Sequence, residues 1–295
     1  MKYALFLGCT VPVRGLNYEI SARAVAKKLE IEFVDVPEFS CCGFPVKAVD
    51  HKATLIMAAK NLAIAEQKKL DICTLCSACT SVLTESNKKL IENPKLMEEV
   101  NKELMKFNLK YSGKIKVKHF SRVLYDEITI EKLKEKIEIP LTGIRLAAHY
   151  GCHYLKPSEI YNNFENPDNP FTFDELIELV GAESPNYRTK KDCCGGGVLG
   201  IKEETALKMA RDKLDNIVDS RIDGIVIMCP FCSIMYEANQ KKIGKKWGRN
   251  YKLPVLYYPQ LLGIALGLGY TEVGLDLNKI ATDELFSNMS IASKQ

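Results

Sequence analysis

The sequence predicts an α/β protein made of two duplicated domains, each a small, mostly parallel sheet flanked by helices. Two observations lead to this prediction. Short apolar segments of strand length alternate with longer segments of helical periodicity, and strands that alternate with helices form parallel sheets. One pattern of cysteines also occurs twice, once in each half of the chain, as expected for a duplicated domain.

The expected strands are short apolar runs, and the expected helices lie between them. In chain order the strands of the first half are KYALFLG, IEFVDV, LDICTL and KVKHF. The helices include YEISARAVAKKLE and HKATLIMAAKNLAIAEQKK, in which apolar residues recur at steps of three and four. The same order recurs after about residue 143, in IRLAAHY and GIVIMCP. We therefore expect domains over residues 1–142 and 143–295, related by a pseudo-twofold axis.

The repeated cysteine pattern consists of a single cysteine, an adjacent pair and a C-x2-C pair. Between the adjacent pair and the C-x2-C pair there are 34 positions in the first copy and 35 in the second. The preceding gap is 32 positions in the first copy and 41 in the second, and the excess falls in the proline-rich segment NFENPDNPF (163–171), which we expect to be a loop. The two sets of five are Cys9, Cys41, Cys42, Cys76 and Cys79, and Cys152, Cys193, Cys194, Cys229 and Cys232.

The eleventh cysteine, Cys73, has no counterpart in the second copy. It lies three residues before Cys76 in the segment CTLCSACTSVL (73–83). A small apolar cysteine packs well in a strand, so we expect Cys73 to be buried and inert.

The composition excludes several classes of protein. The apolar content of 46% and the net charge of +4 fit a globular protein, and no block of Lys and Arg interleaved with aromatics indicates nucleic-acid binding. No secretory signal is recognisable, and the apolar segment 253–270 is too interrupted by Pro and Gly to span a membrane. We expect a cytoplasmic protein, whose reduced cysteines serve metal binding or redox chemistry.

The cysteine pattern favours an iron–sulfur site over a zinc site. A ferredoxin-type run would continue from C-x2-C-x2-C to Cys-Pro, and this one continues to Leu83. Zinc takes four ligands in a closed tetrahedron, whereas each copy here offers five cysteines, two of them adjacent. Adjacent thiolates fit more naturally on different irons of one cluster. The alternative of two structural zinc sites predicts a colourless binding or scaffold protein.

At these residues the chain resembles the CCG-domain proteins, and over its whole length the B subunits of heterodisulfide reductase from methanogenic archaea. The resemblance implies one non-cubane [4Fe-4S] cluster on each set of five cysteines. The disulfide of coenzyme M and coenzyme B would lie between the clusters and be cleaved by two one-electron transfers, without a cysteine nucleophile. It also implies three kinds of partner: a C subunit with ferredoxin-type clusters, a flavin-bearing A subunit, and a hydrogenase or formate dehydrogenase.

Other relatives of this domain serve in thiol-dependent fumarate reduction and in glycolate, lactate and succinate oxidoreductases. Many of those chains are fused to a ferredoxin domain or have lost cysteines from one repeat, and this chain has neither feature. The two copies are not identical, because the second adjacent pair is followed by GGG (195–197) and the first by one glycine, Phe44 and Pro45.

Several further residues are candidates for substrate binding and proton transfer. Both coenzymes are anionic, so we expect a basic entrance. His153 follows Cys152 and is a candidate proton donor, with a packed strand-end histidine as the alternative. We expect Phe231 to shield the metal loop, and His51, His119 and His149 to be structural. The candidate basic residues beside the cysteines are Lys47, Lys156, Arg188, Lys190 and Lys191.

Overall fold

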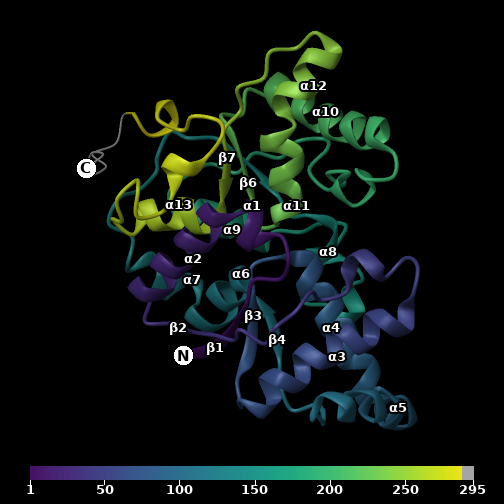
Figure 1. Cartoon of the computed structure of the whole chain (residues 1–295). Coiled ribbons are helices and arrows are strands. Elements are labelled where there is room, and N and C mark those ends of the chain that lie inside the picture. Colours follow the sequence, from purple (N-terminus) through teal and green to yellow (C-terminus); the bar gives the residue numbers. More distant parts are fainter. Residues whose placement is uncertain (288–295) are drawn as a thin grey trace.

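The computed structural model describes residues 1–287 and contains two parallel sheets (Figure 1). The first sheet has the order β2-β1-β3-β4 and the second the order β5-β6-β7, with every pairing parallel. The prediction of two parallel sheets flanked by helices is confirmed. The strands are β1 (Lys2–Phe6), β2 (Glu32–Asp35), β3 (Asp71–Thr74), β4 (Val117–His119), β5 (Leu146–His149), β6 (Gly224–Ile227) and β7 (Val255–Tyr257).

The two sheets repeat the same arrangement of strands. In the first, β1 pairs with β3, and in the second β5 pairs with β6 in the corresponding place. The edge strand β2 has a reduced counterpart, the parallel bridge between Arg145 and Glu183. The strands β5, β6 and β7 are buried along their whole length, which explains their continuous apolar sequences.

The helices cover both sheets and include those expected from the sequence. The expected loop at 163–171 contains no helix or strand. Short 3₁₀ turns at Phe44–Val46 (η1) and Gly196–Val198 (η5) follow the two adjacent cysteine pairs. The α-helices are α1 (Val11–Arg14), α2 (Leu16–Lys28), α3 (His51–Gln67), α4 (Ser77–Glu92), α5 (Pro94–Leu104), α6 (Phe120–Val123), α7 (Ile130–Lys134), α8 (Cys152–Leu155), α9 (Thr172–Leu179), α10 (Glu203–Asp219), α11 (Pro230–Ser233), α12 (Gln240–Trp247) and α13 (Tyr258–Ala265).

The two halves of the chain share one core. Helix α2 of the first half packs against α13 of the second (Figure 1), and the ring of Tyr18 stacks on that of Tyr257 with 4.0 Å between centroids. A second contact joins the halves at the end of β4, where His119 Nε2 lies 2.9 Å from the carbonyl oxygen of Met228. The apolar cluster of buried residues extends through both sheets without interruption.

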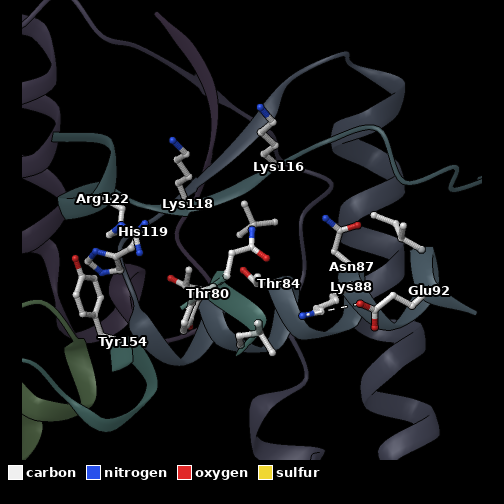
Figure 2. Close-up of a pocket in the computed structure, with 15 residues that line it drawn as sticks. Thr80, Thr84, Asn87, Lys88, Glu92, Lys116, Lys118, His119, Arg122 and Tyr154 are labelled. Atoms are coloured by element: carbon white, nitrogen blue, oxygen red, sulfur yellow. Dashed lines mark ion pairs between the residues drawn. The ribbon is translucent and has the colours of Figure 1, made fainter. Parts of the chain in front are cut away.

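A cavity of about 330 Å³ lies where α4, β4, α6 and α8 meet (Figure 2). Basic side chains line part of it, and two of them pair with carboxylates outside the cavity. Lys118 Nζ lies 2.7 Å from Glu127 Oε1, and Arg122 Nη2 lies 3.2 Å from Asp126 Oδ2. The cavity therefore presents less free positive charge than its lining residues indicate. Among residues 1–287, no helix is both long and apolar enough to cross a membrane.

Candidate metal centres

The cysteines lie where strands end and helices begin. Cys9 follows β1, and Cys76 is the N-cap residue of α4 after β3. In the second half, Cys152 is the first residue of α8 after β5, and Cys229 is the N-cap residue of α11 after β6. The carboxyl ends of parallel strands meet at one edge of a sheet, which is where α/β proteins bind ligands. Each set is therefore gathered at such an edge.

The second set forms a connected group of sulfur atoms. Cys152 Sγ lies 3.9 Å from Cys193 Sγ, and Cys232 Sγ lies 3.5 Å from Cys194 Sγ. Hydrogen bonds from Cys232 and then Cys76 lower the pKa of Cys229. Such a low pKa favours the thiolate, which is the form that binds metal.

The first set is assembled in the same way. Cys9 Sγ lies 3.9 Å from Cys41 Sγ, and hydrogen bonds from Cys41 and Cys79 lower the pKa of Cys42 to about 4. Cys9, Cys42, Cys76 and Cys79 line one small cavity, which Phe231 of the second half also lines. Phe231 lies in the loop between Cys229 and Cys232 of the second set, and we expected it to shield that loop. In the structure its side chain lines the cavity of the first set.

Glycines bring backbone close to the sulfur atoms. The N–H of Gly195 donates to Cys193 Sγ at 3.4 Å, and that of Gly196 donates to Cys194 Sγ at 3.3 Å. In the first set, a Cβ on Gly8 would lie 2.9 Å from Cys79 Sγ, and Gly8 has φ +64°. Five converging thiols with close backbone donors fit an iron–sulfur cluster, since soft thiolates and hydrogen bonds to sulfur are what such a cluster requires.

The two sets meet where the halves of the chain join. Cys76 of the first set and Cys229 of the second share a hydrogen bond, which raises the pKa of Cys76. Phe44 and Phe231 line the same small cavity as Cys76, and the ring of Phe44 lies 5.9 Å from that of Phe231 and 4.9 Å from that of His153. Residues from both copies thus surround the same region.

The candidate basic residues separate into two groups. Lys47, His153 and Lys156 line one open cavity of about 440 Å³, together with Ser81. Arg188, Lys190 and Lys191 line a different cavity of about 370 Å³. Sequence proximity to the cysteines did not distinguish these groups, because it does not tell which side of the sheet a loop faces.

All four of these lysines have partners within the chain, and Lys156 Nζ lies 3.9 Å from Asp168 Oδ1. Lys190 Nζ lies 2.6 Å from Asp174 Oδ1, and both side chains are largely buried. Lys191 Nζ donates to the carbonyl oxygen of Asp168 at 2.6 Å, and Lys47 pairs with Glu85. The buried ion pair with Asp174 gives Lys190 a structural role. Lys47, in contrast, lines the same cavity as His153 and is placed to contact a bound substrate there.

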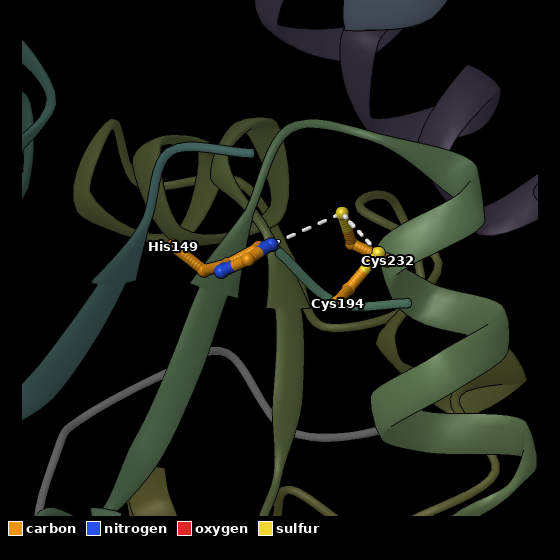
Figure 3. A group of neighbouring side chains, drawn as sticks. All are labelled: His149, Cys194 and Cys232. Atoms are coloured by element: carbon orange, nitrogen blue, oxygen red, sulfur yellow. Dashed lines mark hydrogen bonds between the residues drawn. The ribbon is translucent and has the colours of Figure 1, made fainter. Parts of the chain in front are cut away.

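Sequence reasoning missed two residues next to the second set. His149, expected to be structural, places Nε2 3.1 Å from Cys232 Sγ (Figure 3). The possible ligand atoms of His149, Cys194 and Cys232 all lie within 4.8 Å of one another, so these three side chains could hold a metal ion together. Lys213, with no exposed surface, lies behind His149. A signal existed for Lys213, since it interrupts the apolar face of α10 between Ala210 and Leu214.

Comparisons with known proteins agree with the duplication. The model of the CCG cysteine-rich domain matches residues 3–84 and again residues 146–237. The B subunit of the ferredoxin:CoB-CoM heterodisulfide reductase of Methanosarcina mazei is 36% identical over 98% of this chain and 97% of its own length. The chain belongs to the family of heterodisulfide reductase B subunits.

The chain is also similar to other named proteins. The B subunit of the ferredoxin/F(420)H(2)-dependent CoB-CoM heterodisulfide reductase of Methanosarcina acetivorans is 37% identical over 98% of this chain and 97% of its own. The 8-methylmenaquinol:fumarate reductase membrane anchor subunit of Wolinella succinogenes is 33% identical over 96% of this chain and 99% of its own. The crystal structure of a hypothetical protein from Helicobacter pylori shares the fold, with a TM-score of 0.78 at 18% identity, and this chain spans about half of it, 52%.

Proposed function

We propose that this chain is the catalytic B subunit of a CoB–CoM heterodisulfide reductase, which reduces the disulfide of coenzyme M and coenzyme B to the two thiols in methanogenesis. The observation that carries the proposal is the presence of two complete sets of five cysteines that meet at Cys76 and Cys229. Similarity to subunits of that name over nearly the whole chain supports it.

Each set of five cysteines would hold one [4Fe-4S] cluster of the non-cubane type. The ligands are Cys9, Cys41, Cys42, Cys76 and Cys79 for the first, and Cys152, Cys193, Cys194, Cys229 and Cys232 for the second. When bound, the two clusters would supply the two electrons that cleavage of a disulfide requires, one from each. The expected pseudo-twofold relation between the halves would give each sulfur of the substrate one site of its own.

The remaining residues would bind the substrate and deliver protons. Phe44 and Phe231, whose rings lie 5.9 Å apart, would exclude water from the small cavity that they line with cysteines of the first set. Lys47 and Lys156 would attract the anionic groups of the substrate to the cavity they line with His153. His153 would carry a proton at a ring nitrogen toward a product thiolate. Arg188, Lys190 and Lys191 line the second cavity and would bind an anionic group there.

Electrons would reach this protein from partners. We propose a complex with a C subunit that has ferredoxin-type clusters and with a flavin-bearing A subunit, coupled to a hydrogenase or formate dehydrogenase, in the cytoplasm. The chain itself has no ferredoxin-type cysteine run. Relatives named as B subunits of heterodisulfide reductases support a multisubunit assembly.

A second function is favoured by specific relatives. The 8-methylmenaquinol:fumarate reductase membrane anchor of Wolinella succinogenes matches this chain nearly end to end, and the B subunit of the fumarate reductase (CoM/CoB) of Methanothermobacter marburgensis is 23% identical over 82% of this chain. On this alternative the chain passes electrons between a thiol or quinol and fumarate, with the same cysteines as ligands.

One assay separates the two functions. The complex that contains this chain is purified without oxygen and supplied with reduced methyl viologen, and either the CoM–CoB disulfide or fumarate is added as electron acceptor. We expect the disulfide to oxidise the viologen with release of two thiols per disulfide, and fumarate to oxidise none. His153→Gln should slow the disulfide reaction, with Cys73→Val as the matched control. Oxidation by fumarate alone would contradict the proposal.

A further inference from the structure

The second set of cysteines has a buried chain of hydrogen bonds on one of its ligands. His149 Nε2 lies 3.1 Å from Cys232 Sγ (Figure 3), and on the other side of the ring Lys213 Nζ lies 3.1 Å from His149 Nδ1. Lys213 has no exposed surface and His149 is 1% exposed. The edge of the Tyr236 ring faces His149, with 4.9 Å between the centroids. Water is therefore kept from this chain of contacts.

The direction of these hydrogen bonds follows from the donors that each group has. A lysine ammonium has only donors, so each polar atom that contacts Lys213 Nζ accepts a hydrogen bond from it. It donates to the carbonyl oxygen of Lys190 at 3.0 Å and to His149 Nδ1. Nδ1 is then the acceptor of a neutral imidazole, whose proton must lie on Nε2. The Nε2–H therefore points at the sulfur of Cys232.

Among residues 1–287, the first set has no such chain of hydrogen bonds, although the backbone positions are equivalent. His149 is the last residue of β5, three before Cys152, and Phe6 is the last residue of β1, three before Cys9. Phe6 has no polar atom to offer the cysteines.

Lys213 also has a different residue, Asn61, at the equivalent position of the first copy. Lys213 is the eleventh residue of α10 and Asn61 the eleventh of α3, each 19 positions after the second cysteine of its adjacent pair. The Asn61 side-chain amide forms hydrogen bonds with backbone atoms. It donates to the carbonyl oxygen of Cys41 at 3.2 Å and accepts from the N–H of Ser40 at 2.8 Å. The two sites thus differ beside their ligands even though the ligands match.

We propose that His149 and Lys213 are a positioning pair that donates a hydrogen bond to the Cys232 ligand and makes the second cluster easier to reduce than the first. The proposal rests on the proposed function, because it requires a cluster on the second set. A hydrogen bond to a ligand sulfur stabilises the added negative charge of the reduced cluster and so raises its midpoint potential. Burial strengthens the effect, since little solvent screens the Lys213 charge.

The test replaces the pair by the residues of the first copy. The variants are His149→Phe and the double variant with Lys213→Asn, in the complete complex purified without oxygen, and both midpoint potentials are followed by electron paramagnetic resonance. We expect one potential to fall and the other to stay unchanged. His149→Gln, which keeps an N–H donor, should restore part of the shift. His51→Phe, at an exposed histidine, should shift neither.

Lys213→Met gives a second measurement that leaves the cluster ligand and His149 in place. It should lower the same potential by less than His149→Phe does. Unchanged potentials in iron-loaded variants, or nitrogen couplings that identify His149 as an iron ligand, would overturn the inference. A wild-type protein without iron on the second set would instead contradict the proposed function, so the two failures are distinguishable.

Discussion

Cys73 and Cys76 lie three residues apart, yet the fold gives them different surroundings. Cys73 lies inside β3, opposite Leu5 of β1 and Lys118 of β4, and is fully buried. Burial raises its pKa well above the ordinary value, so the thiol stays neutral. Cys76 begins α4 and meets cysteines of both sets. The duplication in the sequence predicted this difference, because Cys76 has a counterpart and Cys73 has none.

The first prediction is that these two cysteines respond differently to substitution. Cys73→Val should keep the iron content and cost at most about 1 kcal/mol of stability, because the substitution roughly conserves volume. Cys76→Ser should lose the first cluster and with it disulfide reduction, while the second cluster remains. Iron analysis and the disulfide assay measure both effects. Loss of iron from Cys73→Val with full retention in Cys76→Ser would show that the repeat alignment is wrong.

A second prediction concerns Gly8, at the turn between β1 and Cys9. Gly8→Ala should remove iron from the first set only, because the new Cβ would lie 2.9 Å from Cys79 Sγ and its positive φ costs about 1–2 kcal/mol for an L-residue. The matched control is Gly200→Ala, where a Cβ meets nothing within 4 Å. Equal iron content in the two variants would contradict the close approach of Gly8 to the site.

Among the elements, the long strands and helices were predictable and the short connecting pieces were not. Buried parallel strands have continuous apolar sequences and long helices have a clear period, so β1, β3 and α3 could be located from the sequence. The π-helical turns at Leu124–Ile128 and Ile234–Ala238 have no such signal. For the site, the sequence grouped the cysteines, but the direction of a strand-end side chain such as that of His149 depends on packing.

The junction between β4 and α6 leads to a third prediction, on stability and pH. Burial lowers the pKa of His119 from 6.5 to about 4, while its ring bonds to the Met228 carbonyl and to Ser121 Oγ at 2.7 Å. As pH falls below 6.5, His119 becomes protonated in the unfolded chain but stays neutral in the folded chain until the pH nears 4. Stability should therefore fall by about 2 kcal/mol between pH 7.5 and pH 5.

The comparison protein for this prediction is His119→Gln, which cannot titrate. Its melting temperature should be lower at pH 7.5 and should fall less between pH 7.5 and pH 5 than that of the wild type. Differential scanning calorimetry under anaerobic conditions gives both values. An identical decrease in the two proteins would mean that His119 accepts its proton in the folded state.

In the whole molecule, the duplicated halves form one body around two adjacent sites. The stacking of Tyr18 on Tyr257 and the hydrogen bond between His119 and the Met228 carbonyl connect the two halves. Cys76 and Cys229 meet at this junction, so the two sets are neighbours and not independent sites at opposite ends. The sequence predicted the duplication but not this junction, because contacts between distant segments leave no periodic pattern.

The central claim is that each set of five cysteines holds an iron–sulfur cluster. Iron, acid-labile sulfide and zinc, measured together in protein purified without oxygen, test it most directly. A brown protein with about eight irons and about eight sulfides per chain is the predicted result, since two four-iron clusters require that number. A colourless protein with about two zinc ions and no sulfide would contradict the claim.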